Sequence, residues 1–164
     1  MQHDIDEVDG LQQYTRVNNI EIVGLDGEPN GEESVEEMVL ECLNGLVENN
    51  GEKFTAPDID ICHILPKANR SHTHVVRFVS RKSKIDVMNL KKEMRNKKFK
   101  FRNKDIYFNE HLTSKNKNLF NLAKQKQNAN NYKFLWTRNG KIFLRKTENS
   151  AVIKIDSEDI INSL

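Results

Sequence analysis

Apolar residues recur along this chain with two periods, one typical of strands and one typical of helices. Residues 18–25 show strand-like alternation, and residues 59–65 form a second strand-like run. Between them, Ser34 and Glu37 have the spacing of a capping box, which marks the start of a helix. We expect this helix to end at residues 50–51. Its apolar stripe would be Val35, Met38, Val39, Cys42, Leu43 and Leu46.

The pattern continues with a loop at 66–71, a strand at 74–80, a helix at about 83–94 and a strand at 105–112. The order of these elements is strand, helix, strand, strand, helix, strand. This is the split βαβ order of ferredoxin-like and RNA-recognition-motif (RRM-like) domains. We therefore predict an α+β fold in which residues 18–110 form a sandwich of one sheet and two helices.

The C-terminal residues follow a different pattern and predict a small second domain at 111–164. A helix is expected to begin at a cap formed by Thr113 or Ser114, and its apolar pattern ends in the Gln/Asn-rich stretch near Asn130. Two β-rich runs flank the Asn-Gly pair at 139–140, which best tolerates the positive φ angles of a type I′ hairpin turn. The remaining elements are a third short strand at 152–155 and a last helical turn after Ser157.

Residues 1–17 precede both domains and are polar, with Ile5, Val8 and Leu11 at helical spacing. A coiled coil requires three or four heptads, so this segment alone is too short to form one. It could be the stub of a longer coiled coil, in which case we expect a homo-oligomer.

Charge is divided unevenly along the 164 residues, although the formal net charge is only +2. Residues 1–60 contain sixteen acidic and two basic side chains, whereas residues 61–164 contain eight acidic and twenty-four basic ones. A strongly basic segment favours a polyanionic partner such as nucleic acid. Helix capping explains much of the acidic cluster, because the four glutamates between residues 32 and 37 would lie at the positive end of a helix dipole.

Several classes of function find no support in the sequence. No apolar run reaches the ~20 residues that span a bilayer, so we expect no membrane segment. Cys42 and Cys62 form no disulfide framework, which favours a reducing compartment, either the cytoplasm or the nucleus. His72 and His74 lack the spacing of a zinc site, and the glycines form no phosphate-binding loop. We expect no enzymatic activity, no cofactor, no metal and no small-molecule substrate.

Four stretches of the chain resemble known families: QYTRVNNIEIVGL (13–25), HVVRFVSRKSKID (74–86), FNEHLTSKNKNLFNLAK (108–124) and YKFLWTRNGKIFLRKTENSAVIKI (132–155). The first family is the FP (few polyhedra) proteins of baculoviruses with their insect relatives. The second is the first-open-reading-frame proteins of LINE-type retrotransposons. The resemblance spans about residues 11–160 and is most specific in the last stretch. It implies a coiled coil, an RRM-like domain and a small C-terminal domain that together bind and chaperone single-stranded nucleic acid.

The resemblance also implies particular contacts, and this chain departs from the pattern in places. Arg77 and Trp136 match positions that contact RNA in the LINE proteins, and Arg16 remains from a basic pair before the first strand. Ile64 replaces an expected basic residue. We expect binding to depend on charge rather than on stacking against the sheet, because the usual stacking aromatics are absent. The matching positions are Glu21, Thr73 and Val75.

We predict that the chain binds single-stranded RNA or DNA, with little sequence preference, through a basic cleft between the two domains. Trp136 could stack a base or pack on the neighbouring helix, and both roles stay open. The alternative is an FP-type module for protein–protein interaction or structural assembly, because baculovirus FP proteins are associated with virion envelopment and occlusion. The predicted nucleic-acid-binding residues are Arg16, Arg77, Arg81, Lys82, Lys84, Lys115, Lys117, Lys133, Trp136, Arg138, Lys141, Arg145 and Lys146.

Overall fold

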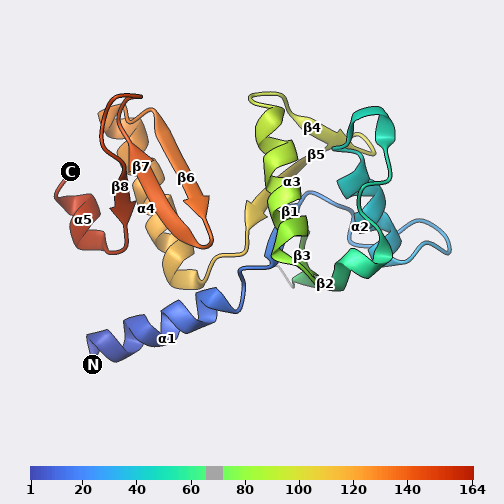
Figure 1. Ribbon diagram of the computed structural model, residues 1–164, viewed down its shortest axis with the longest axis horizontal. Coiled ribbons are helices and arrows are strands. Elements are labelled where there is room, and N and C mark those ends of the chain that lie inside the picture. The colour runs from blue at the N-terminus through green and yellow to red at the C-terminus, as the bar shows by residue number, and fades with distance from the viewer. Residues whose placement is uncertain (66–71) are drawn as a thin grey trace. The chain divides into compact units, whose positions relative to one another are not determined.

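The computed structural model describes residues 1–65 and 72–164. The loop expected at 66–71 therefore lies outside the described residues. The described chain is built from helices and antiparallel strands, labelled in Figure 1, which confirms the α+β fold class. Among the described residues, no helix is both long enough and apolar enough to cross a membrane.

The chain divides into two compact units, a central unit of residues 18–111 and a terminal unit of residues 1–17 and 112–164. The central unit has the predicted order of strands and helices, with one additional short strand. Its five strands lie in the order β2-β3-β1-β5-β4, and all neighbouring pairs are antiparallel. The elements are β1 (Asn19–Val23), α2 (Val35–Asn44), the short 3₁₀ turns η1 (Glu48–Asn50) and η2 (Ala56–Asp58), β2 (Ile59–Leu65), β3 (Thr73–Phe78), α3 (Arg81–Glu93), β4 (Phe99–Phe101) and β5 (Lys104–Glu110).

Two features of the central unit differ from the prediction. Strand β4 was not predicted; it reaches β5 through a turn in which Arg102 and Asn103 both have positive φ angles, 50° and 64°. Helix α2 ends at Asn44 rather than at residues 50–51. The Asn44 side chain donates to the carbonyl oxygen of Phe54 at 2.9 Å and accepts from its N–H at 2.8 Å, so the returning chain is bound where the helix stops.

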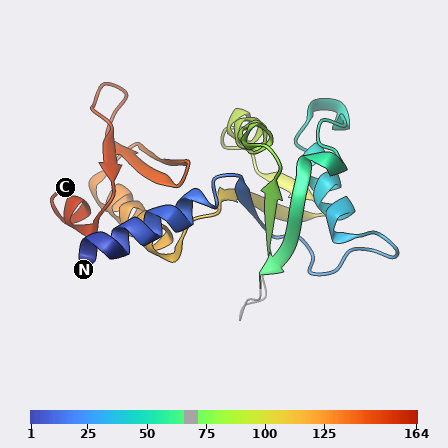
Figure 2. The same cartoon turned by 60° about the horizontal axis from the view of Figure 1, so that its bottom comes forward.

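The core of the central unit lies between one face of the sheet and helices α2 and α3, which can be followed in Figure 2. Ile20 and Ile22 of β1 pack with Val87 of α3 and with the predicted apolar stripe of α2. The capping box forms as predicted. The Glu37 N–H donates to the Ser34 hydroxyl at 3.1 Å, and the Ser34 N–H donates to the Glu37 carboxylate at 3.0 Å.

The terminal unit is a three-stranded antiparallel sheet, in the order β6-β7-β8, packed on helices. The predicted hairpin forms, and Asn139 and Gly140 adopt φ angles of 52° and 77° at its turn. Thr113 caps α4 through its hydroxyl, which accepts from the Asn116 N–H. The elements are α1 (Gln2–Tyr14), α4 (Ser114–Asn130), β6 (Phe134–Arg138), β7 (Lys141–Arg145), β8 (Ile153–Ile155) and α5 (Glu158–Asn162).

The acidic and basic parts of the sequence are not separate parts of the fold. The charge boundary after residue 60 falls inside the central unit, which contains sixteen acidic and fifteen basic residues. Arg102 donates to Glu33 and to Glu41, each at 2.7 Å, and so joins the β4–β5 turn to the acidic segment around α2. Part of the charge that the sequence separates is therefore paired in this unit.

Candidate nucleic-acid interface

The sheet of the terminal unit has one face against helices and one face away from them, because side chains alternate along a strand. Ile142 and Leu144 of β7 and Ile155 of β8 are buried with Leu119 and Ala123 of α4. The opposite face, which we call the outer face, carries aromatic and basic side chains. From the strand register, these are Phe134, Trp136, Arg138, Lys141, Phe143, Arg145 and Lys154.

Aromatic rings occupy the middle of the outer face. Trp136 lies across from Phe143 in the β6–β7 register, and their rings stack with centroids 5.6 Å apart and planes 24° apart. Phe134 lies two positions before Trp136 on β6, and all three rings are partly exposed. Of the two roles left open for Trp136, packing against α4 is not observed, because α4 covers the other face.

Cations lie on both sides of these rings. Arg138 and Lys141 are exposed and face each other beside the hairpin turn, and neither forms an ion pair with a described residue. Lys154 is exposed on β8. Arg145 instead holds the β7–β8 connection, because its Nε donates to the carbonyl oxygen of Ser150 at 2.9 Å.

Two further predicted cations lie at the strand ends, away from the hairpin turn. Lys133 pairs with Glu148 at 2.6 Å, and its Nζ is 5.2 Å from the centroid of the Phe134 ring. The Nζ of Lys146 is 5.7 Å from the centroid of the Tyr132 ring. Lys133 therefore borders the outer face at Phe134, whereas Lys146 lies by Tyr132, which packs against the core of this unit.

The other predicted cations of the terminal unit lie near the start of α4. Arg16 donates to the carbonyl oxygen of Leu112 at 2.9 Å. Lys115 pairs with Asp6 of α1 at 2.9 Å, and Lys117 is exposed on α4.

In the central unit, the predicted cations lie on two different elements. Arg77 of β3 donates from Nε to Asp60 at 2.7 Å, so the mid-strand cation already has an anionic partner. Arg81 and Lys82 are exposed in the first turn of α3.

Lys84 was predicted to bind nucleic acid, but its side chain is buried in the structure. Its side chain is 3% exposed and its Nζ lies 2.8 Å from the carboxylate of Glu110, which is 6% exposed. Lys84 lies three positions before Val87 on the core-facing side of α3, so its ammonium group points into the fold rather than toward a phosphate.

Several residues that could contribute were not predicted. Phe134, Phe143 and Lys154 belong to the outer face. A signal for the two phenylalanines was present, since aromatic and basic residues occupy every second position of both hairpin strands. In the central unit, Tyr107 is 49% exposed on the sheet face opposite Ile106 and Phe108.

The histidines considered as metal ligands lie in different surroundings. His72 is exposed, whereas His74 of β3 is fully buried, and neither of its ring nitrogens has a hydrogen-bond partner among the described residues. Burial lowers the pKa of His74 below its usual value, and the nearby His72 lowers it further. A protonated imidazole is therefore disfavoured in this core.

Replacing His74 with leucine should remove part of the acid sensitivity of folding. In the wild type, the unfolded imidazole binds a proton near pH 6.5 while the folded one does not, so the free energy of unfolding falls as the pH drops below that value. One such group contributes at most about 1.4 kcal/mol per pH unit. Urea unfolding between pH 7.5 and 5 measures the slope. The exposed His63→Leu is the control, and equal slopes in His74→Leu and the wild type would refute the prediction.

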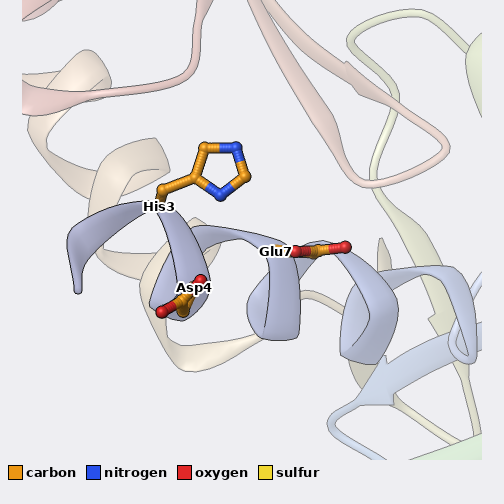
Figure 3. A group of neighbouring side chains, drawn as sticks. All are labelled: His3, Asp4 and Glu7. Atoms are coloured by element: carbon orange, nitrogen blue, oxygen red, sulfur yellow. The ribbon is translucent and has the colours of Figure 1, made fainter.

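A group of metal-ligating residue types lies on α1, where His3, Asp4 and Glu7 have ligand atoms within 4.8 Å of one another. All three are exposed, and Figure 3 shows their side chains leaving the helix in different directions. A metal site requires ligands that converge on one point with a supporting shell. We therefore do not propose a metal site at these three residues.

A comparison with models of known protein families finds a match in the terminal unit. Residues 113–164 match the family model described as Baculovirus FP protein domain 2. The matched segment begins at the N-cap of α4 and includes the whole β6-β7-β8 sheet with its outer face. This supports the resemblance to the baculovirus FP family, whereas the relationship to LINE-type proteins stays a prediction. A search of curated proteins found no match.

Proposed function

We propose that this protein binds single-stranded nucleic acid, with little sequence preference, through the outer face of the terminal sheet. The observation that carries the proposal is the stacked, partly exposed pair of Trp136 and Phe143 with exposed Arg138, Lys141 and Lys154 on the same face. The proposal includes the relationship to LINE-type first-open-reading-frame proteins, which rests on stretches such as residues 132–155.

The physical basis is stacking combined with phosphate neutralisation. Each base stacked on an aromatic side chain contributes ~1–3 kcal/mol, and every base has a face that can stack. Successive rows of the outer face lie ~6.8 Å apart along the strands, which is comparable with one step of an extended single strand. A chain that follows β6 could place bases on Trp136 and Phe134 with phosphates near Arg138 and Lys141. Such contacts distinguish single strands from duplexes, whose bases are already stacked.

Affinity should fall steeply with salt. Each phosphate neutralised on a single strand contributes about −0.7 to the slope of log K against log salt concentration, so three or four outer-face cations give about −2 to −3. Titration of the full chain with a labelled oligonucleotide at several salt concentrations measures this slope. Fluorescence of Trp136, the single tryptophan, provides a second signal, since a stacked base should quench it. No binding at low salt, or a flat response, would refute the proposal.

A second candidate is an FP-type module for protein interaction or assembly, favoured by the surface of α1. Five large apolar side chains of this segment are at least 54% exposed, and exposed apolar surface is typical of protein contacts. On this alternative, a complex should persist after nuclease treatment and in Arg77→Glu. The five residues are Met1, Ile5, Val8, Leu11 and Tyr14.

A further inference from the structure

The acidic helix α1 lies along the first turn of α4. The Lys115 ammonium donates to Asp6 at 2.9 Å, and the Thr113 hydroxyl donates to Asp9 at 3.2 Å. Gln13 is buried, and its side-chain oxygen accepts from the Thr113 N–H at 2.8 Å and from the Asn116 side chain at 3.0 Å. Three successive turns of α1 thus contact one turn of α4.

Electrostatics explains why these helices associate. The first turn of α4 contains Lys115 and Lys117 and no acidic residue, although the positive end of a helix dipole favours acidic side chains. Helix α1 supplies the missing negative charge from outside. The hydrogen bond from Lys115 holds the pKa of Asp6 below its usual value, as expected of a carboxylate with a cationic partner.

The same contact reaches the end of the outer face. Gln13 packs directly on the hairpin turn, because a Cβ atom added to Gly140 would clash with the Gln13 side chain. Arg138 and Lys141 flank that turn. Gln13 therefore links the hairpin turn to the start of α4, where Lys115 lies in the first turn.

We infer that α1 competes with nucleic acid for Lys115. Asp6 forms an ion pair with Lys115 until a phosphate replaces the carboxylate. The inference rests on the proposed function, and it adds an intramolecular regulator to the same surface. An exposed ion pair contributes ~0.2–1 kcal/mol, so the competition is graded rather than all-or-none. A strand bound at Trp136 could extend past Arg138 and Lys141 and make one further phosphate contact once Lys115 is released.

Asp6→Asn in the full chain tests this inference, with Asp4→Asn as its matched control. Both substitutions remove one negative charge from α1, but only Asp6 pairs with Lys115. Oligonucleotide affinity should rise about 2- to 5-fold in Asp6→Asn, as loss of one exposed ion pair predicts. The salt slope should steepen by about 0.7, the contribution of one additional phosphate. Asp4→Asn should change the affinity less and leave the slope unaltered.

The outcomes separate this inference from the function on which it rests. A wild-type protein that binds, with Asp6→Asn and Asp4→Asn equal in affinity and slope, would overturn the competition and leave nucleic-acid binding standing. A wild-type protein that binds no oligonucleotide at low salt would overturn both. Circular dichroism of each variant establishes that the fold is intact, which we expect because both side chains are exposed.

Discussion

Replacing Trp136 with alanine should weaken binding of a single-stranded oligonucleotide about 5- to 150-fold, the equivalent of ~1–3 kcal/mol for one lost stacking platform. The indole stacks on Phe143 on the outer face and lies apart from the core of Leu119, Ile142 and Leu144. Its removal takes away a surface for bases without opening a cavity under α4. Fluorescence anisotropy of a labelled oligonucleotide at constant salt measures the loss.

Two controls make this result specific. Trp136→Phe keeps a ring at the same position and should retain part of the affinity. Leu135→Ala alters the residue just before Trp136 on β6, whose side chain packs on the helix side of the sheet. Because it removes core packing, this substitution should lower the melting temperature more than Trp136→Ala does. Affinity in Trp136→Ala equal to that of the wild type would contradict stacking at this site.

The sequence predicted correctly those features that depend on interactions between residues close together in the chain. The capping box of Ser34 and Glu37 and the Asn-Gly hairpin at 139–140 both formed, because each depends on residues at most three positions apart. The end of α2 depends on a pairing with Phe54, ten residues away. The position of α1 depends on Gln13 and Thr113, which are 100 residues apart. Such contacts leave no periodic signal along the chain.

The same distinction applies to the candidate site. The hairpin turn determines the register of β6 and β7, and Trp136, Arg138 and Lys141 were predicted, but Phe134 and Phe143 on the same face were not. Charge counting along the sequence could not reveal which cations are already paired. Arg77 has Asp60, Lys115 has Asp6 and Lys84 has Glu110, and each partner lies on a different element. Only the folded chain shows which cations are available to a phosphate.

Replacing Lys84 with methionine should destabilise the central unit by ~3–5 kcal/mol, the largest stability change that we expect from a single substitution. Methionine preserves the length and apolar stem of the side chain, so the packing around it should change little. The substitution removes the ammonium group 2.8 Å from Glu110 and leaves a buried carboxylate without its lysine. Chemical denaturation followed by far-ultraviolet circular dichroism measures the effect. Hydrogen exchange at β1, β3 and β5 assigns it to this unit.

The double variant Lys84→Met/Glu110→Leu separates loss of the ion pair from loss of packing. Removing both charges also removes the desolvation cost of each, so the double variant should recover most of the lost stability and could match the wild type. A double variant as unstable as Lys84→Met would instead show that the lysine stem or other contacts of Glu110 dominate. Lys84→Met within ~0.5 kcal/mol of the wild type, the range of ordinary surface substitutions, would refute a structural role for the pair. Because the Lys84 side chain is only 3% exposed, neither variant should alter oligonucleotide affinity of the folded protein.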